Sequence, residues 1–167
     1  PTGSYYESRV RAVRVSAAGQ VLDPTPIAFP PSAFEPSTIG LQLAGVNGQW
    51  LATRCLYHDD GYGTYLAGQR IAGDGTLLDT TPLVLIDWVY GSTVALTANG
   101  EYLVAGSDWS NSSLAKARRI GANGQPLAAA FTVPSLTLAS SGSEYYVVWI
   151  KDYVNLVGSR ITPTGTL

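Results

Sequence analysis

The chain has 167 residues, a formal net charge of −2 at pH 7 and only 13% charged side chains. A balance so close to neutral excludes a strongly basic nucleic-acid-binding domain and a polyanionic tail. Hydrophobic residues make up 46% of the sequence, which is enough for a sizeable core and argues against disorder. No apolar run has the length of a membrane-spanning helix, so we expect one globular domain over residues 1–167 without membrane insertion.

Cys55 is the only cysteine, so an internal disulfide and a zinc cluster built from cysteines are both excluded. The sequence contains no Met, and we therefore expect a processed product or a piece of a longer protein. Thr, Ser, Tyr and Gly are abundant whereas Lys is rare, a composition typical of exported β proteins. We expect an extracellular or cell-surface location.

All predicted elements are β-strands. Short runs rich in β-branched and aromatic residues alternate with turn residues, and no stretch has a sustained period of 3.6 residues. In chain order, the first predicted strands span residues 8–15, 21–29, 39–43, 50–57, 64–71 and 77–86. Asn47-Gly48 and Gly73-Asp74-Gly75 are hairpin turns between them, because Asn and Gly tolerate positive φ. Pro82 must then lie at an edge or a bulge of its strand.

Two sequence motifs recur along the chain. The pattern R-[VI]-x-x-x-G-x-x-L starts at Arg14, Arg70 and Arg119, and its part R-[VI]-x-x-x-G returns at Arg160 and is followed by Thr166-Leu167. A second pattern surrounds the Asn47-Gly48 turn, returns at Asn99-Gly100, and returns with a one-residue slip at Ser141–Trp149. The repeating unit is therefore about 41 to 56 residues long and carries two hairpin signals.

Four antiparallel strands every 40 to 50 residues or so are typical of β-propeller blades, which stack because one blade cannot bury both of its faces alone. We predict an all-β chain of about three and a half blades: a partial blade at residues 1–36, blades at 37–87 and 88–134, and a partial blade at 135–167. The alternative is a sandwich or barrel with accidental local similarity. Known propellers close with roughly four to eight blades, so we expect the ring to close with another copy or with missing blades.

The repeat resembles the secreted bacterial β-propeller repeats whose blades read Y-[LV]-V-x-W … G-x-R-[IVL]-x-x-x-G-x-x-L. The best copy runs from Tyr145 to Trp149 and continues at Gly158–Ile161 with Gly165. The resemblance extends over nearly the whole chain and implies an extracellular or cell-surface protein with a non-catalytic display or binding role. Trp149 has no Trp counterpart in the other two units, and no active-site motif is matched. The resemblance therefore assigns no functional residue.

Candidate ligand-binding residues fall in loops that share one face of such a fold. These loops join the second strand of a unit to the third, or the fourth strand to the first strand of the next unit. The candidates are Asp59, Asp60, Tyr62, Trp88, Tyr90, Asp108, Trp109, Asp152 and Tyr153. Rings that stack on sugars and carboxylates that accept hydroxyl hydrogen bonds would make a sugar-binding rim. The alternative is turn chemistry, in which Asp caps turns and the rings pack on blade edges.

Other chemical interpretations rest on fewer residues. The loop aspartates lack the oxygen spacing of an EF-hand-type Ca²⁺ loop. His58 is the only histidine and no G-x-S-x-G motif occurs, so a serine-hydrolase triad has no support. Cys55 has apolar neighbours, and we expect a buried, inert thiol. The recurring arginines could form an anion-binding ring, but four copies of one position indicate that each pairs with an acid and covers a neighbouring strand.

The function that these patterns favour is a non-catalytic extracellular binding or assembly module. Unpaired edges at the partial blades would associate with a second copy or with neighbouring blades of a longer chain. A glycan-binding, lectin-like propeller is the alternative, and a carbohydrate-active hydrolase or lyase is a third hypothesis. We expect no catalytic residue, metal, cofactor or nucleic-acid partner.

Overall fold

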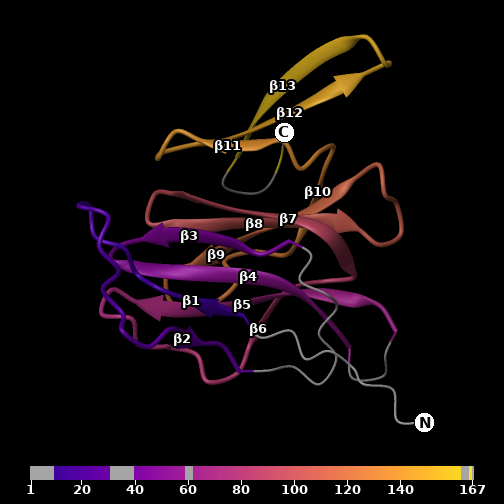
Figure 1. Cartoon of the computed structure of the whole chain (residues 1–167). Helices are drawn as coiled ribbons and strands as arrows, with labels where there is room; N and C mark the ends of the chain where they lie inside the picture. Colours follow the sequence, from indigo (N-terminus) through magenta and orange to yellow (C-terminus); the bar gives the residue numbers. More distant parts are fainter. Residues whose placement is uncertain (1–9, 31–39, 59–61, 163–165, 167) are drawn as a thin grey trace.

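The computed structural model describes residues 10–30, 40–58, 62–162 and 166, and these residues form an all-β structure without helices. Their strands make four antiparallel sheets that lie one after another along the molecule (Figure 1). The prediction of an all-β chain with antiparallel sheets is confirmed. The sheets of the described residues do not close into a barrel or a ring.

Each sheet is built from strands that follow one another in the sequence. Sheet 1 pairs β1 (Arg11–Ala12) with β2 (Ile27–Ala28). Sheet 2 has the order β3 (Gln42–Val46), β4 (Gln49–Tyr57), β5 (Thr64–Ala72) and β6 (Leu83–Asp87). Sheet 3 has the order β7 (Val89–Ala98), β8 (Glu101–Asp108), β9 (Ala115–Gly121) and β10 (Phe131–Val133). Sheet 4 has the order β11 (Leu138–Ser140), β12 (Tyr145–Lys151) and β13 (Asn155–Ile161).

The hairpins between the first two strands of sheets 2 and 3 form at the predicted Asn-Gly pairs. Asn47 and Gly48 have φ values of 50° and 75°, and Asn99 and Gly100 have nearly the same values, 52° and 75°. Two successive residues with positive φ give the tight turn whose twist matches that of the flanking strands. The turn chemistry of the sequence therefore sets the register of both hairpins.

Some predicted strand limits are wrong. The strand predicted at residues 77–86 is regular only from Leu83 onward, and Leu77 makes a single isolated bridge to Ile71. Pro82 precedes the strand instead of lying inside it, because proline has no N–H for the ladder. The strand predicted at 39–43 is found at Gln42–Val46, although Ile39 lies outside the described residues. In sheet 1 only short pairs form within the predicted 8–15 and 21–29 strands.

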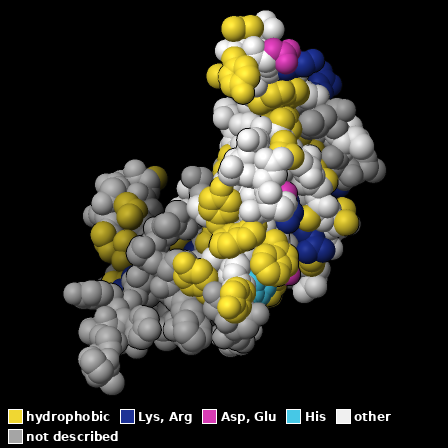
Figure 2. Space-filling view, turned by 90° about the vertical axis from the view of Figure 1, so that its right-hand side faces the viewer, with side chains coloured by type: hydrophobic (Ala, Val, Ile, Leu, Met, Phe, Trp, Pro, Cys, Tyr) yellow, Lys and Arg dark blue, Asp and Glu magenta, His cyan; other side chains and the backbone are white. Residues whose placement is uncertain are grey.

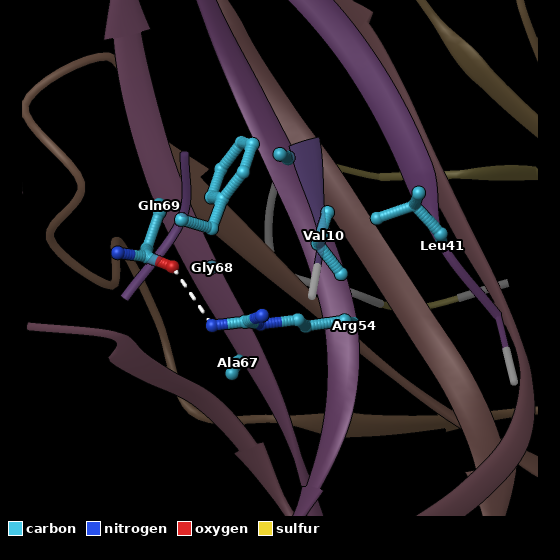
Figure 3. Close-up of a pocket in the computed structure, with 8 residues that line it drawn as sticks. Val10, Leu41, Arg54, Ala67, Gly68 and Gln69 are labelled. Carbon is cyan, nitrogen blue, oxygen red and sulfur yellow. Dashed lines mark hydrogen bonds between the residues drawn. The ribbon is translucent and has the colours of Figure 1, made fainter. Parts of the chain in front are cut away.

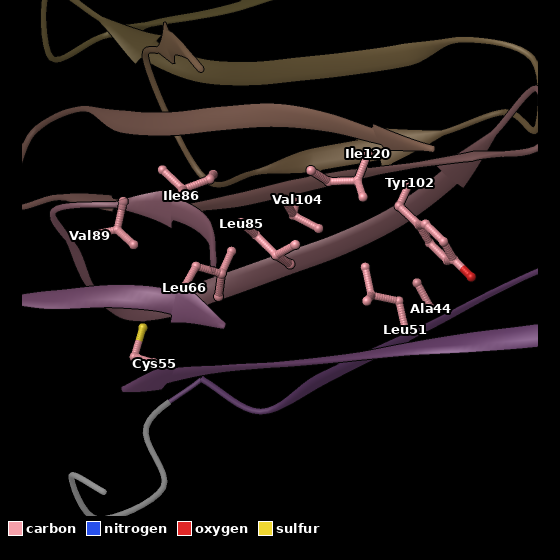
Figure 4. Packing of buried hydrophobic residues seen from close by; sticks show 10 residues of the cluster. All are labelled: Ala44, Leu51, Cys55, Leu66, Leu85, Ile86, Val89, Tyr102, Val104 and Ile120. Carbon is pink, nitrogen blue, oxygen red and sulfur yellow. The ribbon is translucent and has the colours of Figure 1, made fainter. Parts of the chain in front are cut away.

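Apolar side chains fill the space between each sheet and the next. Leu51 and Cys55 of β4 lie in one cluster with Tyr102 and Val104 of β8, which joins sheets 2 and 3 (Figure 4). A second cluster joins sheets 3 and 4, and its buried members are Ala98, Leu103, Ala105, Ala115, Ala117, Val133, Tyr145, Val147 and Ile161. A smaller cluster joins sheets 1 and 2 through Val10, Phe29, Ala52 and Ile71. Each inner sheet therefore buries one face on its predecessor and the other on its successor.

This packing makes a test of the stacking possible. We expect Leu51→Ala to lower the free energy of unfolding by about 2–5 kcal/mol, because Leu51 is completely buried between sheets 2 and 3. Leu78→Ala is the matched control, because Leu78 is largely exposed and should change stability by less than about 1 kcal/mol. Urea unfolding followed by circular dichroism measures both. Equal costs for the two variants would contradict the stacked arrangement.

Candidate functional site

Three aromatic residues lie in the connections that follow β4, β6 and β8, and a fourth lies at the start of β7. Tyr62 follows β4, Trp88 lies between β6 and β7, and Trp109 follows β8, while Tyr90 is in β7 itself. The backbone N–H of Trp109 donates a hydrogen bond to the backbone carbonyl of Trp88 at 3.0 Å, and this bond links two of the connections. We call Tyr62, Trp88, Tyr90 and Trp109 the aromatic rim. Figure 2 shows hydrophobic side chains gathered around the single histidine, His58, which contacts this rim.

Trp88 holds an unusual backbone conformation at the centre of the rim. Its φ is 56°, in the left-handed region that bulky residues rarely adopt. The indole ring covers Gly63, where an added Cβ would approach ring carbons to 2.5 Å, and Gly63 itself has φ +71°. The His58 ring is tilted against the Trp88 indole ring, and the centroids of the two rings are 5.5 Å apart. A glycine at position 63 is therefore required both by its φ and by the ring that lies on it.

Tyr90 and Trp109 border an open hollow on the same rim. Their rings meet edge to face with centroids 5.7 Å apart, a favourable arrangement for aromatic pairs. The hollow has a volume of about 390 Å³ and is completed by Ser110 and Ser112. Two rings beside two hydroxyl groups offer an apolar surface together with hydrogen-bonding partners, which is the composition of a site for a small polar ligand.

Asp108 does not face this hollow as a free carboxylate. Its Oδ1 accepts hydrogen bonds from the Ser110 N–H at 2.9 Å and the Ser110 hydroxyl at 2.8 Å, and Lys116 Nζ lies 3.3 Å away. The backbone N–H of Ser110 is the main reason why the pKa of Asp108 is lowered, and Lys116 adds to the effect. The side chain is buried in these contacts. Turn chemistry, the alternative weighed from the sequence, accounts for this residue.

The other predicted site residues are placed apart from the rim or lie outside the described residues. Asp152 and Tyr153 form the turn between β12 and β13 of sheet 4, with φ values of 54° and 62°. Tyr153 is fully exposed. Asp59 and Asp60 lie outside the described residues. The structure thus brings together the rim residues of sheets 2 and 3 and leaves the sheet 4 pair separate.

His58 and Cys55 are the two residues with reactive side chains near the rim. His58 Nε2 lies 2.8 Å from Asp87 Oδ1, a close approach without the alignment of a hydrogen bond. Cys55 is buried, and burial raises its pKa to about 11. A thiol of this kind is almost entirely protonated at neutral pH and is a poor nucleophile. The prediction of a buried Cys55 is confirmed.

The recurring arginines pair with acids inside their own sheets, as predicted. Arg14 and Arg70 each hold the aspartate nine positions later, with Nη2 to Oδ1 distances of 2.6 Å to Asp23 and 2.7 Å to Asp79. Arg119 instead pairs at 2.5 Å with Glu101 of the neighbouring strand β8. Arg160 pairs at 3.2 Å with Glu144, which occupies the same repeat position as Glu101. The arginine keeps its place while the acid comes from either neighbouring segment.

Two of these arginines also reach the following sheet, a contact that has no signature in the sequence. Arg14 Nη1 donates to the carbonyl of Gly73 at 2.8 Å, and Arg70 Nη1 donates to the carbonyl of Ala122 at 3.3 Å. Gly73 and Ala122 occupy the same repeat position, three residues after the arginine of their own unit. We call this the arginine joint: the arginine of one sheet bonded to the turn after the third strand of the next.

The outer sheets leave the two sides of this joint uncovered. The hydrophobic residue that follows the arginine is 3% exposed at Ile71, 0% at Ile120 and 5% at Ile161, but 58% at Val15. The arginine side chain shows the reverse trend, with 29%, 17% and 19% exposure at Arg14, Arg70 and Arg119, against 70% at Arg160. Among the described residues, therefore, no sheet covers one face of sheet 1 and none covers the opposite face of sheet 4.

An apolar groove lies where sheet 1 meets sheet 2. It has a volume of about 390 Å³ and runs beside β1, with Val13, Leu22, Leu43 and Trp50 among its lining residues. Trp50 is 42% exposed, whereas Tyr102 and Tyr145, which occupy the same repeat position, are buried. The side chains that bury Tyr102 come from β3 and β4 of the preceding sheet, and sheet 1 has no described counterpart of those strands.

A small pocket between sheets 1 and 2, in which Arg54 and Gln69 lie among apolar residues, was not predicted from the sequence (Figure 3). Arg54 donates to Gln69 Oε1 at 3.1 Å and to the Pro30 carbonyl at 2.9 Å, and its guanidinium lies 5.9 Å from the centre of the Phe29 ring. Only the position of Arg54 inside an otherwise apolar strand hinted at such a site. Its donors serve the protein itself, so the pocket is part of the packing.

Comparison of the chain with protein-family models, curated proteins and solved structures finds no match. Over the described residues, His, Cys, Asp and Glu form no group of three or more that could hold a metal ion. The described part of the chain also contains no helix long and apolar enough to cross a membrane.

Asp108 allows a test of the turn chemistry by pH. Its pKa lies below the value near 3.8 of an unperturbed Asp, so its charge stabilises the fold above that pH, and the contribution is lost as the pH falls through the lowered pKa. We expect Asp108→Asn to destabilise the protein at pH 7 and to weaken the loss of stability between pH 5 and pH 2, roughly the range over which such a carboxylate titrates. Urea midpoints across this range measure both effects. Asp152→Asn, in an exposed turn, is the control, and an equal change in it would contradict the assignment.

Proposed function

We propose that this chain is a non-catalytic, extracellular assembly module built from β-propeller-type blades. The observation that carries the proposal is the pair of uncovered faces on the outer sheets, at Val15 on sheet 1 and Arg160 on sheet 4. Inside the molecule the same two positions are covered by the neighbouring sheet. The stack of sheets repeats one contact and leaves half of that contact unoccupied on each outer sheet. A further sheet could therefore bind at either end of the stack.

The propeller assignment rests on the repeat and on the sheet order. Sheets 2 and 3 each contain four antiparallel strands in sequence order, and each packs face to face against its neighbours. This is the organisation of propeller blades, which contact only the blades beside them. The extracellular location rests on composition and on the resemblance of the repeat. A ring would close by addition of sheets from another copy or from further repeats of a longer chain.

The size of the uncovered apolar surface favours assembly. Ile150 and Leu156 pair across β12 and β13 and are 69% and 77% exposed. At the opposite side, Val21 bridges Val15 and is also mostly exposed. Contiguous exposed hydrophobic residues on sheet faces mark interaction surfaces. Each outer sheet presents such a set.

The native mass tests this proposal. We expect the 167-residue protein to self-associate as its concentration rises, with species near multiples of 17.6 kDa in light scattering or native mass spectrometry. The apolar faces should drive this, so association should weaken on cooling, as hydrophobic contacts do. Sedimentation at several concentrations and a folded reference by circular dichroism complete the measurement. A monomer at every concentration up to the solubility limit would contradict assembly by this chain.

Glycan binding at the aromatic rim is the second candidate function. The hollow between Tyr90 and Trp109 carries it, because rings and the Ser110 and Ser112 hydroxyl groups meet there at an exposed surface. Such a module would bind sugars by stacking and hydrogen bonding without turnover. A carbohydrate-active hydrolase or lyase has less support than either of these functions, because Asp108, one of its candidate carboxylates, is held in a turn.

A glycan array tests the rim. We expect any sugar bound by the protein to lose at least about tenfold in affinity on Trp109→Ala, a cost in line with the loss of a stacking aromatic residue from a binding site. Trp50→Ala is the control, because Trp50 is a similarly exposed tryptophan at the other end of β4. Absence of binding to any glycan, or equal losses in the two variants, would contradict this function.

A further inference from the structure

The arginine joint between sheets has a constant geometry inside the molecule. In both described cases the arginine of one unit donates to the carbonyl three residues after the next arginine, at 2.8 Å for Arg14 and 3.3 Å for Arg70. The same arginine also bonds an acid of its own sheet. Because a guanidinium has five N–H donors in a planar fork, one side chain can make both contacts at once.

The turn that receives the arginine is shaped for it by a glycine. An added Cβ at Gly75 would lie 3.1 Å from Arg14 Nε, and one at Gly124 would lie 2.9 Å from Arg70 Nε. Both glycines also have positive φ. Gly19 occupies the same position in the first unit and has the same kind of φ, but no atom lies within 4 Å of its Cβ position. The turn at Gly19 thus resembles the turns at Gly75 and Gly124, but no arginine of a preceding sheet lies against it.

The donor side of the joint is uncovered on sheet 4. The Arg160 guanidinium lies 6.0 Å from the centre of the Tyr146 ring and contacts Glu144, and most of the side chain is exposed. Cross-strand pairing places Tyr146 opposite Arg160 and Ile150 opposite Leu156 on the face that points away from sheet 3. Tyr146 holds the repeat position of Leu51 and Leu103, which are buried against the next sheet.

The acceptor side of the joint is uncovered on sheet 1. Ala12 and Arg14 turn toward sheet 2, so Val15 alternates to the opposite face, where it bridges Val21. The carbonyl of Ala17 occupies the position of the Gly73 and Ala122 carbonyls, and no described residue donates to it. Val15, Ala17 and Gly19 are all exposed. One chain therefore displays both halves of its own internal joint.

We infer that a second copy of this chain docks head to tail, with Arg160 of one copy donating to the Ala17 carbonyl of the other. The inference rests on the proposed assembly function and names its partner and its contact. Val15 and Val21 of one copy then cover Ile150 and Leu156 of the other, as Ile71 and Ile120 are covered inside the stack. Because the two surfaces differ, the interface is heterologous, and further copies can add until the assembly closes or continues.

Two single substitutions disable one half of the joint each. Arg160→Ala removes the donor, and Val15→Lys places a charge on the acceptor face opposite Arg160. Both side chains are mostly exposed, so both variants should keep the fold, which circular dichroism verifies. Lys151→Ala is the control, because it removes a positive charge from the same sheet at a position outside the repeat of arginines. We expect each disabling variant to weaken self-association roughly ten- to hundredfold, the range for loss of a charged hydrogen bond, and the control to leave it unchanged.

A mixture of the two variants gives the decisive result. Arg160→Ala retains the acceptor face and Val15→Lys retains the donor face, so the mixture should form one wild-type joint. It should yield a heterodimer at concentrations at which each variant alone stays monomeric. Sedimentation of the variants, one of them with a fluorescent label, measures this. Self-association of the wild-type protein that neither variant weakens, or a mixture that stays monomeric, overturns the head-to-tail contact and leaves assembly standing. A wild-type monomer at all concentrations overturns both.

Discussion

The structure depends on one hydrogen-bonded arrangement, the arginine that closes the third strand of each unit. Its guanidinium holds a carboxylate of its own sheet and, for Arg14 and Arg70, a turn carbonyl of the next sheet. The hydrogen bonds that each guanidinium donates to its carboxylate raise the pKa of both arginines. The acid itself is exchangeable between neighbouring segments: Asp79 serves Arg70, while Glu101 serves Arg119. A lysine could not make both sets of contacts, because an ammonium lacks the planar fork.

The glycine in the repeat follows from the same arrangement. The turn after the third strand needs positive φ, which glycine adopts without strain. The arginine of the preceding sheet then lies against that glycine, as Arg70 does at Gly124. The recurring arginine-to-glycine spacing therefore records two contacts, one within a sheet and one between sheets. This explains why the motif survives where flanking residues differ.

Much of the local structure could be predicted, because it depends on neighbouring residues. Asn47-Gly48 and the strands on either side of it fix a hairpin with little help from the rest of the fold. The contacts between sheets could not be predicted, since Arg14 and the Gly73 carbonyl are 59 residues apart and a backbone carbonyl has no residue signature. Likewise, the sequence predicted both Asp108 and Trp109 as ligand-binding residues. Only the structure shows that Asp108 accepts a hydrogen bond within its own turn, whereas the Trp109 ring is exposed.

In the proposed assembly, the joint seen between sheets is also the joint between copies. Hydrogen exchange at the arginine Nη–H groups, which make the contact between sheets, can be followed by nitrogen-15 NMR and reports on each arginine separately. We expect slow exchange at Arg14, Arg70 and Arg119 in dilute protein, and fast exchange at Arg160 that slows as the concentration rises. Equal exchange at Arg70 and Arg160 in dilute protein, or fast exchange at Arg160 at every concentration, would contradict it.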